Sequence, residues 1–236
     1  IGDIGNTSTR ICLLFKSKII KSIIFDTKKI FLRNYLKKIF NKLLKKKFKK
    51  EILFSCVVPL ALKKIKKTLK NTNYKVLEIK NFDLKSLIKL NVKNKKQLGS
   101  DRIVNSIEGK KFKNCLIIDF GTATTFDIVK NGIYEGGAIA PGVKLSIKNL
   151  SHSTALLPIF DLKNQQKSYG KNTKDALNAG FIWGYEGLIN NIINKITKNW
   201  KTKYKIILTG GYANLFKKII KRRTIIDQNI TIKGVS

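Results

Sequence analysis

The chain has 236 residues, of which 43% are hydrophobic, so it can bury a core and differs in composition from a disordered chain. Lysine and arginine outnumber acidic residues 49 to 14, which gives a formal net charge of +35. There is no run of 18 apolar residues and no signal-peptide pattern, so we expect no membrane span and a cytoplasmic location.

Lysine supplies almost all of the positive charge, because only five of the 49 basic residues are arginine. Lysine, isoleucine and asparagine have A/T-rich codons, so genomic base composition explains the excess. The alternative is a surface that binds nucleic acid. Arginine, the usual bidentate phosphate ligand, is scarce, and aromatic residues do not alternate with the lysines. We therefore predict no specific nucleic-acid partner.

The first half of the chain has the pattern of an α/β lobe. A strand fragment opens the chain, and apolar runs separated by a polar turn predict antiparallel strands after it. Apolar residues at helical spacing predict an amphipathic helix over residues 29–47. The predicted elements are, in order, strands 11–15 and 19–25, helix 29–47, strand 52–58, helix 61–69, strand 74–79 and a helix after the motif at 94–105.

The same pattern restarts near residue 112, which predicts two α/β lobes, 1–108 and 109–236. The only histidine, His152, is expected in a polar loop or at a helix end. The predicted elements are strands 115–119, 126–129, 132–140 and 204–208 and helices 172–199 and 212–220.

Each lobe begins with a strand that ends in an acid, a glycine and hydroxyl residues. In the first, Asp3 precedes Gly5, which permits a tight turn, and the hydroxyls of Thr7, Ser8 and Thr9 follow. Such a turn can bind phosphate through amides and hydroxyls. Asp3 repels phosphate, so we expect it to hold Mg²⁺ through water. An ordinary hairpin turn is the alternative.

The second turn has the same parts, with Asp119, Gly121 and the hydroxyls of Thr122, Thr124 and Thr125. Two such turns in one chain favour a common triphosphate ligand. Gly210 and Gly211 follow a later strand and leave bare backbone against which a flat adenine ring fits, although paired glycines also mark simple turns. There is no Walker A motif.

A further motif, Gly99-Ser100-Asp101-Arg102, lies between the two turns and precedes a helix. Asp101 can accept a hydrogen bond from an alcohol, and the planar Arg102 guanidinium suits a carboxylate. A substrate that carries both groups would satisfy the pair. The alternative is a helix cap with an exposed ion pair.

The order of these motifs resembles type III pantothenate kinases of the actin-like ATPase, sugar kinase and Hsp70 superfamily. The resemblance covers nearly the whole chain and includes Gly136–Gly142 and Gly170–Thr173. It implies two ribonuclease-H-like lobes, a duplicated actin-like ATPase fold, with a nucleotide cleft between them. The implied reaction is ATP-dependent phosphorylation of pantothenate to 4'-phosphopantothenate, the first step of coenzyme A biosynthesis.

The same resemblance implies roles for individual residues. Asp101 would be the catalytic proton acceptor, and Asp119 would hold a monovalent cation, K⁺ or NH₄⁺. Thr173 would reach the substrate of the partner subunit in a homodimer. Substrate would also contact Gly99, Ser100 and Arg102, and ATP with its Mg²⁺ would contact Asp3, Ile4, Gly5, Asn6, Thr7, Ser8, Thr9, Arg10, Thr122, Gly210 and Gly211.

One segment departs from the family pattern. Family members usually carry Tyr-x-Asn-Pro shortly before the Gly-x-Asp-Arg motif, whereas this chain has Val92-Lys93-Asn94-Lys95. The departure leaves open a kinase for another small hydroxy acid. The charge leaves open a non-catalytic relative with a regulatory or nucleic-acid-binding role. Helix 172–199 is apolar on more than one side, which suits either the core of one chain or a dimer interface.

Overall fold

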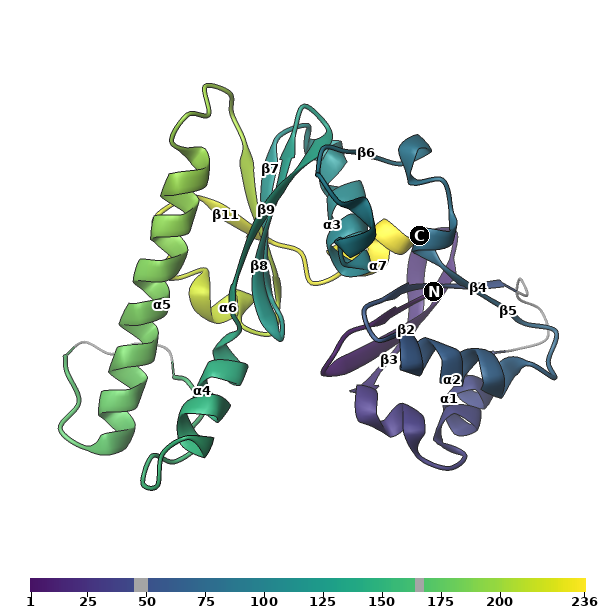
Figure 1. The fold of residues 1–236 in the computed structure, drawn as a ribbon, viewed down its shortest axis with the longest axis horizontal. Helices are drawn as coiled ribbons and strands as arrows, with labels where there is room; N and C mark the ends of the chain where they lie inside the picture. The colour runs from purple at the N-terminus through teal and green to yellow at the C-terminus, as the bar shows by residue number, and fades with distance from the viewer. Residues whose placement is uncertain (45–50, 164–167) are drawn as a thin grey trace. The chain divides into compact units, whose positions relative to one another are not determined.

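A computed structural model describes residues 1–44, 51–163 and 168–236, which form two compact units (Figure 1). Unit 1 comprises Ile1–Lys111, Asn131–Glu135 and Asn229–Ser236, and unit 2 comprises Phe112–Lys130 and Gly136–Gln228. The sequence predicts lobes with one boundary, whereas these units interleave along the chain. The last segment, Asn229–Ser236, belongs with the first unit.

Unit 1 is built on a five-stranded sheet with the order β3-β2-β1-β4-β5. The first three strands are antiparallel neighbours, and β4 and β5 run parallel to β1. The predicted strands of this region are confirmed. Their bounds are β1 Gly2–Ile4, β2 Ser8–Phe15, β3 Lys18–Asp26, β4 Glu51–Cys56 and β5 Lys75–Glu78.

Helices cover both faces of this sheet. Alternate residues Ile52 and Phe54 pack on α1 (Tyr35–Leu43) and α2 (Pro59–Leu69). Leu53, between them, packs against the opposite group, α3 (Ser100–Gly109) and α7 (Ile230–Val235). This alternation decides which strand residues lie on the α3 face. Short elements complete the unit: η1 Thr27–Phe31, η2 Ile79–Asn81, η3 Leu84–Ser86, β6 Lys89–Leu90, η4 Lys95–Gln97 and η5 Lys110–Phe112.

The single helix predicted over 29–47 is wrong in its first part. Residues Thr27–Phe31 form a 3₁₀ helix, and Asn34, in the left-handed conformation with φ 58°, separates it from α1. A left-handed residue interrupts the helical hydrogen bonds. The apolar periodicity continues on both sides of Asn34, and for this reason it predicts one helix where the backbone forms two. Residues 45–47 of the prediction lie outside the described residues.

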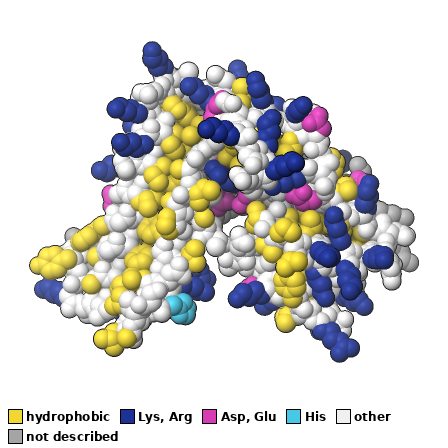
Figure 2. Space-filling view, in the orientation of Figure 1, with side chains coloured by type: hydrophobic (Ala, Val, Ile, Leu, Met, Phe, Trp, Pro, Cys, Tyr) yellow, Lys and Arg dark blue, Asp and Glu magenta, His cyan; other side chains and the backbone are white. Residues whose placement is uncertain are grey.

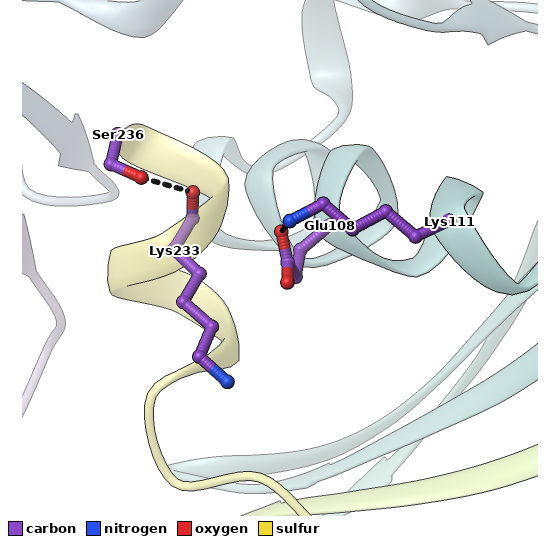
Figure 3. Close-up of polar contacts among 4 residues, drawn as sticks. All are labelled: Glu108, Lys111, Lys233 and Ser236. Atoms are coloured by element: carbon purple, nitrogen blue, oxygen red, sulfur yellow. Dashed lines mark hydrogen bonds and ion pairs between the residues drawn. The ribbon is translucent and has the colours of Figure 1, made fainter. Parts of the chain in front are cut away.

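Helix α7, which the sequence pattern did not predict, packs on α3. A Cβ on Gly234 would lie 1.8 Å from the carbonyl oxygen of Val104, so only glycine permits this approach. Thr231 Oγ1 donates to Asn105 Oδ1 at 2.8 Å. In Figure 3 the Ser236 hydroxyl donates to the Lys233 carbonyl, and Lys111 pairs with Glu108 near the end of α3.

Unit 2 contains a sheet with the order β11-β10-β7-β8-β9 and helices on one face (Figure 1). Leu116, Ile118 and Phe120 point toward α4, α5 and α6, so Ile117 and Asp119 belong to the other face. The bounds are β7 Cys115–Phe120, β8 Ala123–Lys130, β9 Ile133–Pro141, α4 Val143–His152, α5 Thr173–Thr197, β10 Lys205–Gly210, α6 Ala213–Phe216 and β11 Thr224–Ile226. The first residues of β9 belong to unit 1, where they pair with β6.

The predicted strands and the long helix of unit 2 are confirmed. His152 is the last residue of α4, in agreement with a helix end. The helix predicted over 212–220 is shorter, because α6 ends at Phe216. Within the described part of the chain, no helix is long and apolar enough to cross a membrane. Figure 2 shows lysine and arginine side chains on the visible surface of both units.

Candidate active site

Asp3 lies at the centre of the unit 1 sheet on the face that carries α3. It occupies β1, between β2 and β4, and pairs in register with Arg10 and Ser55. Ile4, the next residue, is fully buried in the opposite core. The period of two along a strand therefore directs Asp3 and Ser55 away from that core and toward the beginning of α3.

Burial raises the pKa of Asp3 to about 6, since the carboxylate loses hydration. The Ser55 hydroxyl and the Arg10 guanidinium act in the opposite direction, and the negative charge of Asp101 adds to the rise. Asp3 Oδ1 and Ser55 Oγ are buried, yet neither has a partner with hydrogen-bond geometry among the described residues. Ser55 therefore faces Asp3 closely enough to influence its charge but leaves Oδ1 available to a ligand.

The Gly99–Arg102 motif forms the first turn of α3. Asp101 folds back over Gly99, where a Cβ would lie 2.4 Å from Asp101 Oδ1. That oxygen also accepts from the backbone nitrogen of Arg102 at 2.8 Å. Ser100 is buried and donates to Glu78 Oε1 at 2.6 Å. The electrostatic effect of Asp101 on Asp3 shows that unit 1 brings these two predicted residues together.

Glu78 and Ser55 also belong to this site, although no sequence motif predicts them. Glu78 is the last residue of β5 and accepts a hydrogen bond from Ser100 of the motif. Ser55 reaches Asp3 only because β4 pairs with β1. Neither residue stands in a local pattern that differs from an ordinary strand end, so no sequence signal separates them.

The turn after Asp3 connects β1 to β2. The Gly5 nitrogen donates to the Ser8 carbonyl at 3.0 Å, and Asn6, Thr7 and Ser8 are exposed. Thr9 is fully buried, and its hydroxyl lies 2.9 Å from the hydroxyl of Thr27. The outer side of the turn is therefore accessible at Asn6, Thr7 and Ser8. Arg10 lies beyond the turn and donates from Nε to Ser22 Oγ at 3.0 Å.

In unit 2, Asp119 stands near the end of β7 on the face opposite the helices. The Gly121 nitrogen donates to the Ala123 carbonyl at 3.1 Å, which closes the turn. Thr122 lies against Gly142, where a Cβ would be only 2.0 Å from the Thr122 carbonyl oxygen. Thr124 is buried and donates to Pro141 O at 3.1 Å, so its hydroxyl supports the turn from inside.

Gly210 and Gly211 end β10 beside this turn. Gly210 has φ +84°, and a Cβ on it would lie 2.6 Å from Asp119 Oδ1 and from the Phe120 backbone. The Gly211 nitrogen donates to the Phe120 carbonyl at 3.1 Å, and Gln228 donates to the Gly210 carbonyl at 3.1 Å. Unit 2 thus brings the predicted residues Asp119 and Gly210 into contact, in a space that a side chain would fill.

Thr173 is the first residue of α5 and is exposed. It lies at one end of an open cavity of about 630 Å³ between α4 and α5. The Asn172 side chain caps the helix by accepting from the Asp175 nitrogen at 3.0 Å. The cavity wall is mainly apolar and includes Leu150, Leu157, Leu177, Phe181 and Leu188.

The donors of unit 1 fit a hydrated divalent cation. Asp3 Oδ1 is a buried carboxylate oxygen with no hydrogen-bond partner in the described part of the chain, and a metal-bound water or a cation would satisfy it. The described residues contain no group of three or more His, Cys, Asp or Glu side chains around one point. Mg²⁺ in phosphate-transfer sites needs only one or two carboxylates, because water and phosphates supply the other ligands.

The three cysteines are free thiols with no place in this chemistry. Cys12 and Cys115 are buried, and Cys56 is partly buried. Burial raises the pKa of Cys56 to about 11 and that of Cys115 to about 12, so these two thiols stay protonated at neutral pH. This placement is that of structural thiols.

Comparison with known sequences identifies one family. The sequence model described as "Type III pantothenate kinase" matches residues 1–195. A curated relative named type III pantothenate kinase from Pelagibacter ubique is 46% identical over all of this chain and 96% of its own length. Another with that name, from Sulfurihydrogenibium, is 38% identical over 78% of this chain and 75% of its length.

Solved structures agree at the level of the fold. A protein from Campylobacter jejuni, described as a Baf family transcriptional activator, covers 99% of this chain and 93% of its own with a TM-score of 0.63 and 22% identity. Lmo2764 from Listeria monocytogenes, described as an N-acetylmannosamine kinase, has a TM-score of 0.55, 13% identity and coverage of 99% and 95%. At these identities the likeness concerns the fold alone, and the predicted actin-like, two-lobed α/β fold is confirmed.

Proposed function

The chain belongs to the type III pantothenate kinase family, and we propose that it transfers the γ-phosphoryl group of ATP to the primary alcohol of pantothenate. The product is 4'-phosphopantothenate, at the first step of coenzyme A biosynthesis. The observation that carries the proposal is that Asp3 of β1 and Asp101, in the first turn of α3, lie on the same face of the unit 1 sheet. One acid there suits a cation, and the other stands at the beginning of α3, where a substrate can approach.

Asp101 is the residue that accepts the alcohol proton. Phosphoryl transfer passes through a loose transition state, so the proton leaves late and a carboxylate can accept it. Gly99 lets the substrate approach the backbone, and Ser100 and Arg102 help to hold it. The Arg102 guanidinium matches the carboxylate of pantothenate in charge and geometry. Glu78 supports this turn of α3 through its bond with Ser100.

The nucleotide contacts two sets of residues. The segment from Asp3 to Arg10 contacts the ATP phosphates and Mg²⁺, with Asp3 on the metal side, and Thr122, Gly210 and Gly211 contact ATP. Asp3 would hold hydrated Mg²⁺ and Asp119 would hold K⁺ or NH₄⁺, and both ions would offset negative charge on the triphosphate. Asp3, whose pKa is about 6 without ligand, gives up its proton more readily beside a cation, because an opposite charge favours the carboxylate.

We also propose a homodimer in which Thr173 contacts the substrate of the partner subunit. The apolar cavity beside Thr173 supports it, since hydrophobic side chains gather over α4 and α5 in Figure 2. A Cβ on Gly184 of α5 would meet no atom within 4 Å, so Gly184→Arg fits the single chain but would block a second copy. Sedimentation velocity tests this: the variant should be monomeric with unchanged helicity, and a dimeric variant would refute the proposed interface.

The proposed location is the cytoplasm, and the proposed partner set contains neither a membrane nor a specific nucleic acid. The positive surface should retain DNA only at low salt, because non-specific phosphate contacts weaken steeply as salt rises. Retention that persists at moderate salt would support the regulatory alternative instead.

The test of function is ATP consumption by the purified chain with and without pantothenate, with other small hydroxy acids in parallel. We expect turnover that depends on pantothenate and falls when Na⁺ replaces K⁺. Asp101→Asn should lower kcat at least a hundredfold and keep nucleotide binding. Glu51→Gln is the matched control, since Glu51 is an exposed carboxylate of the same unit. Turnover without pantothenate, or an active Asp101→Asn variant, would contradict the assignment.

A further inference from the structure

One buried residue outside every sequence motif contacts the phosphate-binding turn at three points. Thr27 follows β3 in the chain, begins η1 and is only 3% exposed. We propose that Thr27 is a positioning residue that holds the Gly5–Thr9 turn in the shape that binds the ATP phosphates. The inference rests on the proposed function for the identity of the ligand, but its geometry is independent of the phosphate acceptor.

The hydrogen bonds form a directed chain. Thr27 Oγ1 donates to the Gly5 carbonyl at 2.7 Å. A hydroxyl has one proton, so Thr9 must be the donor in the 2.9 Å contact between the two threonine hydroxyls. The Thr27 backbone nitrogen also donates to the Thr7 carbonyl at 2.9 Å. Thr27 thus engages the first, third and last residues of the turn at once.

These contacts orient the peptide groups of the turn. In a trans peptide the carbonyl and the next N–H point in opposite directions. Holding the Gly5 carbonyl toward Thr27 therefore directs the Asn6 N–H to the other side, and holding the Thr7 carbonyl does the same for Ser8. That other side is exposed at Asn6 and Ser8. Because carbonyl oxygens repel phosphate and N–H groups attract it, Thr27 turns the favourable side of the loop outward.

The same geometry explains the burial of Thr9. A fully buried hydroxyl cannot reach a phosphate in the conformation described, and its bond to Thr27 satisfies it instead. Thr9 and Thr27 join β2 and the segment after β3 beneath the turn. Removing the Thr27 hydroxyl leaves the Gly5 carbonyl without that donor and Thr9 without its acceptor, so the turn should relax toward other arrangements.

Two substitutions separate the hydroxyl from the shape of the side chain. Thr27→Val keeps the branched shape and removes the bonds, and Thr27→Ser keeps the hydroxyl and removes one methyl group. Thr197→Val is the matched control: Thr197 is a buried threonine of unit 2 whose hydroxyl donates to the Ile193 carbonyl at 2.8 Å. The full-length chain is used throughout. Calorimetry gives the Kd for ATP with Mg²⁺, steady-state kinetics give both KM values, and thermal unfolding without ligand monitors the fold.

Thr27→Val should raise the Kd and KM for ATP about tenfold. This factor corresponds to a loss of binding free energy equal to the contribution of one hydrogen bond. The KM for pantothenate should stay within twofold, and Thr27→Ser should restore ATP binding. Thr197→Val should lower thermal stability without changing the Kd for ATP. If Thr27→Val unfolds, Thr9→Val is tested in its place. It removes the hydroxyl that donates to Thr27, and it should show the weaker ATP binding.

Three results would overturn the role of Thr27. They are an unchanged Kd for ATP in a folded Thr27→Val protein, an equal loss in Thr27→Ser, and an equal rise of both KM values. The proposed function fails separately: a wild-type chain that binds ATP but does not consume it with pantothenate would reject the kinase reaction. The calorimetric comparison would still decide whether Thr27 holds the turn.

Discussion

Asp3 costs the free protein stability at neutral pH, and replacing it tests this directly. Its ordinary pKa of 3.8 rises to about 6 in the folded chain, mainly because burial removes hydration. A difference of about two pH units corresponds to about 3 kcal/mol of unfolding free energy as an upper limit. We expect Asp3→Asn to stabilise the ligand-free protein by up to this amount above pH 6, while it lowers kcat at least a hundredfold.

The sign follows from proton linkage. Below about pH 3.8 Asp3 is protonated in both states, so it contributes no pH dependence. Between about pH 4 and 6 the folded state binds more protons than the unfolded state, and stability of the wild type falls as pH rises, by at most about 1.4 kcal/mol per pH unit. Above pH 6 the penalty is constant. The advantage of Asp3→Asn should therefore grow from pH 4.5 to 6 and then level off.

Urea unfolding of the ligand-free chain at pH 4.5, 6.0 and 7.5 measures this difference. Ser55→Ala should act in the opposite direction above pH 6, because the Ser55 hydroxyl lowers the pKa of Asp3. Glu51→Gln provides a control for the loss of one exposed carboxylate. An Asp3→Asn protein less stable than the wild type at pH 7.5, or a stability difference that does not vary with pH, would refute the reasoning.

Three further predictions concern unit 2. Gly210→Ala should destabilise the protein by about 1–3 kcal/mol, because φ +84° and the 2.6 Å approach to Asp119 Oδ1 exclude a Cβ; an unchanged Tm would contradict this. Tyr185→Phe should cost about 1 kcal/mol in urea unfolding, since the Tyr185 hydroxyl bonds to Ser146 at 2.9 Å and to the Pro141 carbonyl at 3.2 Å. Asp119→Asn should lower kcat and abolish the difference in turnover between K⁺ and Na⁺ buffers. If the variant is still activated by K⁺, Asp119 does not hold the cation.

Local chemistry allowed the sequence to predict much of the site. A strand residue's face follows from its parity, so the alternation along β1 is enough to place Asp3 opposite the buried Ile4. Gly5 and the exposed residues after it mark a turn by composition alone. The Gly99–Arg102 motif stood at a predicted helix start, where α3 begins. These features depend on neighbours within a few residues.

Other features depend on partners far along the chain. Ser55 and Glu78 reach the site through strand pairing and through α3, and nothing in their own sequence neighbourhood distinguishes them. Asn34 broke a helix that periodicity had predicted, because the apolar pattern continues across the left-handed residue. Periodicity reports which face is buried, not whether the backbone between two buried residues is continuous.

The amino-acid sequence by itself determined the family, the strands that carry Asp3 and Asp119, and the helix that begins at the Gly99–Arg102 motif. Only the tertiary structure placed Thr27 beneath the phosphate-binding turn and returned α7 to the first unit, against α3. The physical reason is the separation along the chain between the residues that interact. Turn and strand preferences arise from adjacent residues, whereas Thr27 meets Gly5 across 22 positions of the chain and Gly234 meets Val104 across a far longer separation. Such contacts exist only after the sheet has formed.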